Sequence, residues 1–97
     1  MKSLLKMMEA KERVELYDKA ISKWGMRPQV DMVFEECGEL VTALARWLRG
    51  RGNGEEVITE LADVSIMIEQ MTSIFGKDKF DAEVERKLIR LKERLEK

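Results

Sequence analysis

The chain has 97 residues, with 18 Lys and Arg against 19 Asp and Glu, so its net charge of −1 provides no basic surface of the kind that binds nucleic acid. It contains no histidine, which excludes Ser/His/Asp and Cys/His catalysis and the Glu-x-x-His motif of di-iron bundles, and which disfavours zinc. Any chemistry must therefore depend on carboxylates, amines, guanidinium groups and water.

The first half of the chain predicts two helices separated by a glycine. Apolar residues at three- and four-residue spacing predict a helix from about Met8 to Trp24, which Gly25 ends. A second helix is expected from about Pro28 to Arg49, because proline suits the first turn of a helix. Its main apolar stripe consists of Val30, Val33, Phe34, Cys37, Val41, Leu44 and Leu48.

The second half predicts two more helices. Residues 49–54 form a glycine-rich connection, and Asn53 is the expected N-cap of a third helix from about Glu55 to Phe75. That helix is apolar around much of its circumference, so we expect part of its surface to meet another subunit. Gly76 ends it, and Asp78 is expected to cap a fourth helix that runs to the end of the chain. The apolar stripe of this last helix consists of Phe80, Val84, Leu88, Leu91 and Leu95.

Together these elements describe one all-α domain over residues 1–97. No run alternates polar and apolar residues as a strand would. We expect an antiparallel, four-helix, bundle-like subunit and, because so short a chain buries little surface, a homodimer or homotetramer. The single cysteine excludes an internal disulfide, Lys6 and Glu9 interrupt the N-terminal apolar residues too early for a signal peptide, and no stretch is apolar enough for a membrane span. A cytoplasmic protein without membrane contact is therefore expected.

Two pairs of carboxylates lie within apolar sequence, Glu36 with Glu39 and Glu60 with Asp63. The members of each pair are three residues apart, so they share one face of a helix. Carboxylates are costly to bury without a compensating cation, and the simplest explanation is a bound metal ion. If the second and third helices form an antiparallel hairpin, the four residues spread over roughly two turns, on the order of 10 Å. This geometry permits one cluster without requiring it, and the alternative is two exposed polar faces with coincidental spacing.

A site made only of carboxylates suits Mg²⁺, with Mn²⁺ as a substitute, and leaves positions open for water and phosphate oxygens. A carboxylate-held Mg²⁺ that also binds a polyphosphate neutralises the charge that develops during hydrolysis. The acids therefore favour hydrolysis of a phosphate ester or anhydride.

The segment Glu35-Glu36-Cys37-Gly38-Glu39, followed after twenty residues by Glu60-Leu61-Ala62-Asp63, resembles the Glu-Glu-x-x-Glu and Glu-x-x-Asp signature of the MazG-like, all-α nucleoside triphosphate pyrophosphohydrolases. Trp24-Gly25 and Gln29 before the motif, and Lys87-Leu88-Ile89-Arg90 on the last helix, are similar to flanking elements of that superfamily. The similarity covers about Tyr17 to Arg94. The resemblance implies Mg²⁺-dependent cleavage of an NTP or dNTP between its α and β phosphates, giving the monophosphate and pyrophosphate, in a role such as nucleotide-pool housecleaning.

The resemblance also implies a role for each site residue. Glu36, Glu39, Glu60 and Asp63 would hold the Mg²⁺ ion. Glu35 would either support the metal ligands without binding the ion itself or be the base that orients the attacking water. Lys87 and Arg90 would contact phosphate oxygens, and Gln29 would contact the nucleotide. Nothing in the sequence marks a pocket for the base.

Other interpretations remain open. Phosphoribosyl-ATP pyrophosphatases share the expected fold, but they typically carry a His soon after the Glu-x-x-Asp motif, and residues 64–69 contain none. The chain also fits a non-catalytic helical oligomerisation or interaction module, whose acids would bind a structural cation or a basic partner. Lys87 and Arg90 are explained equally well as charges on a solvated helix face.

Overall fold

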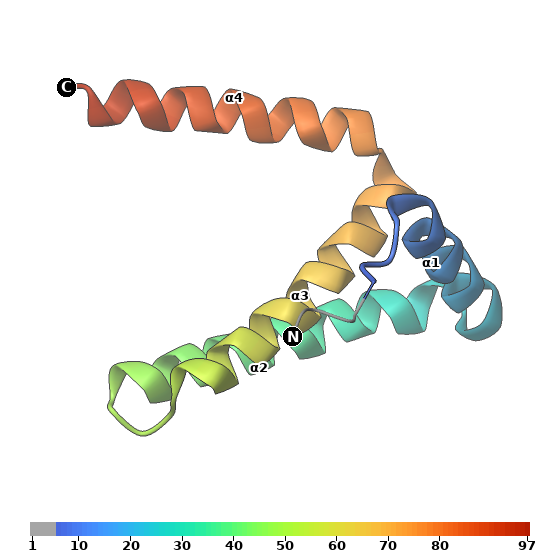
Figure 1. Cartoon of the computed structure of the whole chain (residues 1–97), viewed down its shortest axis with the longest axis horizontal. Coiled ribbons are helices and arrows are strands. Elements are labelled where there is room, and N and C mark those ends of the chain that lie inside the picture. The colour runs from blue at the N-terminus through green and yellow to red at the C-terminus, as the bar shows by residue number, and fades with distance from the viewer. Residues whose placement is uncertain (1–5) are drawn as a thin grey trace.

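The computed structural model describes residues 6–97, and this part of the chain contains helices and no strand. Its elements are α1 (Ala10–Trp24), α2 (Met26–Leu48), α3 (Gly54–Phe75) and α4 (Lys77–Leu95), shown in Figure 1. The predicted all-α class is confirmed. No helix among residues 6–97 combines the length and hydropathy that a membrane span requires. Residues 1–5, which belong to the segment compared with signal peptides, lie outside the described range.

The capping residues predicted from the sequence agree with the observed helix ends, with one exception. Asn53 is the predicted N-cap of α3, and its Oδ1 accepts a hydrogen bond of 2.8 Å from the backbone N–H of Glu56. Pro28 lies in the first turn of α2, where backbone N–H groups have no partner within the helix, so the missing N–H of proline costs no hydrogen bond. The prediction that Asp78 caps α4 is wrong. Gly76 occupies the cap with φ of 132°, a value that only glycine adopts readily, and Asp78 falls in the first turn.

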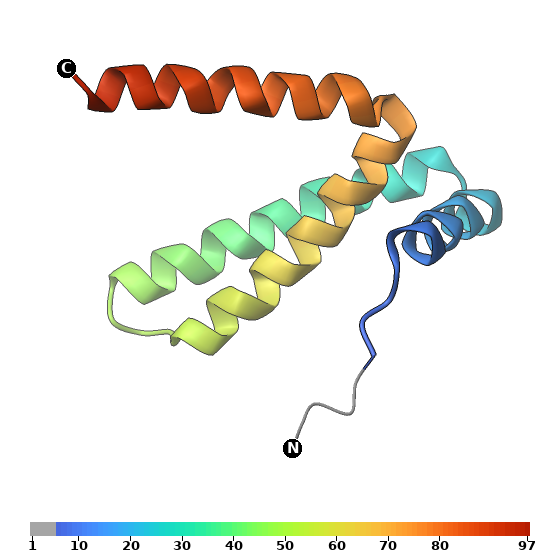
Figure 2. The same cartoon turned by 45° about the horizontal axis from the view of Figure 1, so that its top comes forward.

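Helices α2 and α3 form an antiparallel hairpin, which we call the hairpin, joined by residues 49–53 (Figures 1 and 2). Their contact is the most extensive in the described chain. Its interior is small and partly polar, since the buried side chains of the two helices are Gln29, Ala43, Val64, Met67, Gln70 and Thr72. The hairpin therefore has too little apolar interior to account for all of its apolar residues.

The main apolar stripe of α2 lies mostly on the surface. Phe34 is 72% exposed, Val41 66% and Leu48 77%. The face of α2 that is buried against α3 carries Gln29 and Ala43 instead. The residues that periodicity marks as the most apolar are thus left without a partner in one chain.

Helix α1 packs against α2 and α3 and is fastened to α3 by a polar cluster. Glu69 Oε1 accepts a hydrogen bond of 2.7 Å from Arg13 Nε and a second from the hydroxyl of Tyr17, which is buried. The hydrogen bond from Tyr17, followed by that from Arg13, holds the pKa of Glu69 below its usual range. This cluster fixes α1 against the hairpin.

We expect Tyr17→Phe to lower the free energy of unfolding by about 1 kcal/mol, because it removes one hydrogen bond to a charged acceptor and keeps the ring. Urea denaturation followed by circular dichroism measures the change. The matched control is Arg86→Gln, which removes the exposed ion pair with Glu83 and should leave the stability nearly unchanged, because solvent screens such a pair. Equal effects of the two substitutions would contradict the anchoring role of Tyr17.

Helix α4 contacts α3 and no other helix, and it runs away from the hairpin after Gly76 (Figures 1 and 2). None of its residues is buried. The four helices therefore do not close into a bundle within one chain, because α4 has no second helix to pack against.

Candidate metal centre

The hairpin brings the two predicted carboxylate pairs together. Glu36 and Glu39 extend from α2, and Glu60 and Asp63 extend from α3. One carboxylate oxygen from each of the four lies within 4.8 Å of the others, so we call them the acid quartet. Glu39 is exposed and the other three are half-buried. The side chains thus bridge the stagger that helix rise alone leaves between Glu36 and Glu60.

Close packing of like charges changes the protonation of the quartet. Hydrogen bonding with Glu39 is the main cause that raises the pKa of Glu36 to about 7, followed by desolvation and by the charges of Asp63 and Glu60. Burial raises the pKa of Glu60, and the charges of Glu39 and Asp63 add to the effect. Without a cation, the quartet therefore retains a proton near neutral pH.

One oxygen of the quartet, Glu60 Oε1, is buried and has no hydrogen-bond partner. Within residues 6–97, no Lys or Arg forms an ion pair with a member of the quartet; the ion pairs of this part of the chain involve other acids. A buried carboxylate oxygen without a donor or a cation is costly. Four carboxylates with such an oxygen suit a hard divalent cation such as Mg²⁺ or Mn²⁺, which prefers oxygen ligands.

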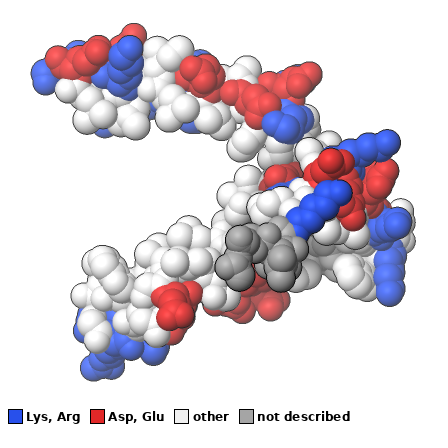
Figure 3. All heavy atoms as spheres, in the orientation of Figure 1, with Lys and Arg blue, Asp and Glu red and all other residues white. Residues whose placement is uncertain are grey.

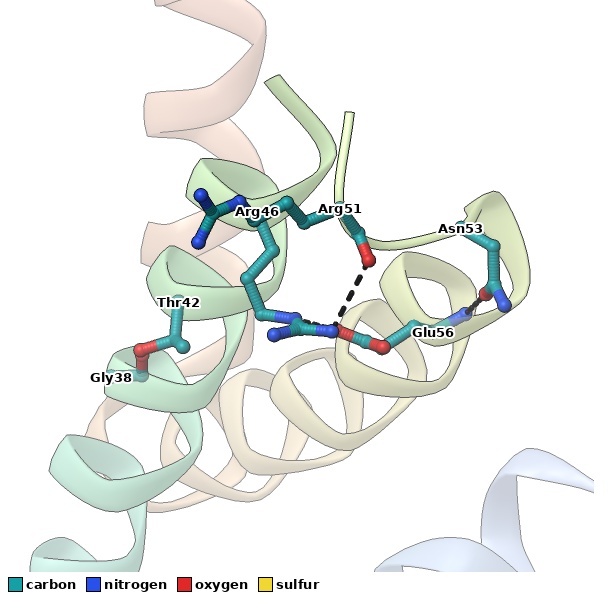
Figure 4. Close-up of polar contacts among 6 residues, drawn as sticks. All are labelled: Gly38, Thr42, Arg46, Arg51, Asn53 and Glu56. Atoms are coloured by element: carbon teal, nitrogen blue, oxygen red, sulfur yellow. Dashed lines mark hydrogen bonds and ion pairs between the residues drawn. The ribbon is translucent and has the colours of Figure 1, made fainter. Parts of the chain in front are cut away.

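The quartet borders an open groove of about 470 Å³ between α2 and α3, which we call the acid groove. Its lining consists of Phe34, Glu35, Gly38, Glu39, Thr42, Ala43, Glu56 and Glu60. The predicted base Glu35 therefore lies in the groove beside Glu39. The Thr42 hydroxyl donates to the carbonyl of Gly38 at 3.0 Å, so its proton is engaged within the helix (Figure 4). The groove thus offers carboxylates and space, with Glu35 outside the quartet.

A basic residue that sequence reasoning missed lies at the loop end of this groove. Arg46 Nε donates to Glu56 Oε1 at 3.1 Å, and Arg46 Nη2 donates to the carbonyl of Arg51 at 3.3 Å (Figure 4). Arg46 follows Glu39 by seven residues, or two helical turns, so both lie on the same side of α2. The seven-residue spacing from Glu39 is the feature of the sequence that could have indicated Arg46.

None of the three predicted substrate-binding residues lines the acid groove. Gln29 is only 4% exposed, and its amide nitrogen lies 4.0 Å from the sulfur of Met32. Lys87 and Arg90 lie on α4, where Lys87 pairs with Glu83 at 3.6 Å. Because α4 leaves the hairpin after Gly76, neither cation lines the acid groove of its own chain.

No family model, curated protein or solved structure matches this chain. A proposal about function therefore rests on the acid quartet, the unpartnered Glu60 oxygen and the groove beside them. It rests also on the resemblance of the two acidic motifs to the MazG-like signature.

Proposed function

We propose that this chain is a Mg²⁺-dependent nucleoside triphosphate pyrophosphohydrolase of the MazG-like type, which cleaves an NTP or dNTP between the α and β phosphates. The observation that supports it most is the convergence of the acid quartet from two helices around the unpartnered oxygen of Glu60. Two acidic motifs twenty residues apart would not meet at one point unless the hairpin aligned them. We further propose that the chain acts as a homodimer or homotetramer.

In this proposal Glu36, Glu39, Glu60 and Asp63 hold the metal ion. Bound there, Mg²⁺ supplies positive charge beside the phosphate oxygens as negative charge develops on them. Binding of the cation would also release the proton that Glu36 retains, because the charge of the ion favours the ionised carboxylate. The fully ionised quartet is then the form that holds the ion.

Glu35 is the residue proposed to act on water. It lies in the acid groove, outside the quartet, with an exposed carboxylate. The water oxygen bonds to the α phosphorus, and the bond from that phosphorus to the oxygen bridging to the β phosphate breaks. Glu35 accepts the proton of the water as general base, and pyrophosphate leaves with the bridging oxygen.

The phosphates also require cations from the protein. Arg46 is the basic residue at the acid groove of the same chain, and its guanidinium is partly exposed beside Glu56. Lys87 and Arg90 remain proposed phosphate contacts, but α4 holds them away from the groove of their own chain. Their participation requires a second copy of the chain or a different orientation of α4.

The experiment that tests this function is an incubation with a panel of NTPs, dNTPs and phosphoribosyl-ATP, with Mg²⁺, Mn²⁺ or EDTA, followed by identification of the products. We expect monophosphate and pyrophosphate in equal amounts from at least one nucleotide, with Mg²⁺ and not with EDTA. Incubation in ¹⁸O-labelled water should place the label in the monophosphate, since the attack is at the α phosphorus.

Three results would contradict the proposal. Release of orthophosphate would indicate attack at the terminal phosphate. Turnover confined to phosphoribosyl-ATP would favour the related pyrophosphatase. No turnover of any substrate, in a protein whose thermal unfolding responds to Mg²⁺, would favour a non-catalytic module with a structural cation.

A further inference from the structure

One aromatic side chain in the acid groove has no part in the chemistry described so far. Phe34 lines the groove beside Glu35 and is 72% exposed. Gly38 lies one turn further along α2 and lines the groove as well, so the two residues are neighbours on one face of the helix. A Cβ atom added at Gly38 would meet nothing of the described chain within 4 Å beyond its neighbours in the helix. The groove therefore contains an open aromatic ring with a gap beside it.

The ring lies at one end of the groove, and the basic residues of the hairpin lie at the other. Phe34, Gly38 and Thr42 follow one another at four-residue spacing, so they form a line along α2 that leads toward the loop. Gly38 and Thr42 are shown in Figure 4. Glu56 and its ion-pair partner Arg46 lie at the loop end. The members of the acid quartet that line the groove lie between these two ends.

The charges along the hairpin favour one direction for a nucleotide in the groove. Figure 3 shows basic side chains at the loop end of the hairpin and acidic side chains farther along it. Arg49 and Arg51 of the loop are exposed, and neither forms an ion pair with an acid of the described chain. With the α phosphate at the quartet, the negative terminal phosphate is attracted toward the loop. The uncharged base then lies at the end of the groove that carries Phe34.

The side chains of the groove suit the face of a base better than its edge. None of the residues that line the groove in the described chain carries a side-chain N–H group, and the Thr42 hydroxyl donates its proton to the carbonyl of Gly38. Reading the edge of a base by hydrogen bonds requires donors as well as acceptors. Stacking on an aromatic ring requires neither, because every base has a π face. The groove is therefore suited to a base that is held by its ring.

We propose that the base of the nucleotide stacks on Phe34, with the ribose in the gap at Gly38 and the terminal phosphate toward the loop. The substrate class is then nucleotides of any base, with purines bound more tightly than pyrimidines because the larger ring system stacks more strongly. This inference rests on the proposed function for the position of the α phosphate. It adds a residue that selects nucleotides over phosphate chains without a base.

The test compares two phenylalanines with nearly equal exposure, Phe34 at 72% and Phe75 at 75%. Phe75 lies at the end of α3, outside the acid groove. Calorimetric titration with Mg²⁺ measures binding of the α,β-methylene analogues of ATP and UTP, which resist cleavage at that bond, and of inorganic tripolyphosphate. We expect the ATP analogue to bind more tightly than the UTP analogue. Phe34→Leu should weaken binding of the ATP analogue by about five- to tenfold, and Phe75→Leu should leave it unchanged.

Tripolyphosphate separates the base contact from the metal site, since it is a chain of phosphates without a base. Its affinity should be the same for Phe34→Leu and the unmodified protein, and Phe34→Trp should bind the ATP analogue at least as tightly as the unmodified protein does. An unchanged affinity of Phe34→Leu for the ATP analogue, an equal loss for tripolyphosphate, tighter binding of the UTP analogue, or no binding of either analogue would each overturn the proposal.

Turnover of unmodified NTPs is measured separately, so that the two proposals can fail independently. Absence of hydrolysis in a protein whose nucleotide binding depends on Phe34 would contradict the proposed activity and support the stacking site. Full hydrolysis with an unchanged KM in Phe34→Leu would support the activity and overturn the stacking site.

Discussion

Glu60→Gln is expected to reduce turnover by more than about a hundredfold, since even residues that only support metal ligands cost up to about that factor when replaced. The same substitution should leave the metal-free protein as stable as before or more stable. Gln removes a charge from the quartet, and its amide nitrogen can donate to a neighbouring carboxylate, where Glu60 Oε1 now has no partner. Turnover is measured by pyrophosphate release, and stability by thermal unfolding in EDTA.

The change in melting temperature on addition of Mg²⁺ shows whether Glu60 is a metal ligand or a general acid or base. A cation at about 100 times its Kd stabilises a protein by about 2.7 kcal/mol, so Mg²⁺ should raise the melting temperature of the unmodified protein by several degrees. Glu60→Gln should lose most of that increase. Glu55→Gln, on the exposed first turn of the same helix, is the matched control and should keep both turnover and the Mg²⁺ response. Full activity of Glu60→Gln would remove this residue from the metal site.

The metal-free protein is expected to become less stable as the pH rises from about 5 to 8. The folded-state pKa of Glu36 is about 7, above the ordinary value of 4.5 that it has when unfolded. Its protonation therefore favours the folded state fully below pH 4.5, and this contribution is lost as the pH rises through 7. The raised pKa of Glu60 acts in the same direction. Thermal unfolding in EDTA across this pH range measures the effect.

Two comparisons test the origin of that pH dependence. Glu36→Gln should flatten the profile, because its side chain carries no titrating proton, and saturating Mg²⁺ should also flatten it by stabilising the ionised quartet. Glu69 has a lowered pKa, so its contribution is lost only as the pH falls below about 4.5, outside this range. A profile that is equally steep in Glu36→Gln would show that another group is responsible.

The sequence by itself determined the helices of this protein and their ends. Gly25, Gly76 and the segment 49–53 separate the helices because they meet local requirements, namely positive φ at the two glycines and, at Asn53, a carboxamide that accepts the capping hydrogen bond. The three-residue spacing of Glu36 and Glu39, and of Glu60 and Asp63, likewise identified each half of the candidate site, because both members of a pair share a helix face. Such features depend on neighbours within one or two turns.

Only the tertiary structure decided how these elements meet. The quartet converges because long side chains bridge the stagger between α2 and α3, which a count of helix rise cannot include. Most of the apolar stripe of α2 stays exposed because the buried face of this helix is a different one, which carries Gln29 and Ala43. The position of Lys87 and Arg90 depends on the angle at which α4 leaves Gly76. Periodicity marks which faces of a helix are apolar, but the packing partner determines which of them is buried, and that partner lies far away in the chain or on another copy.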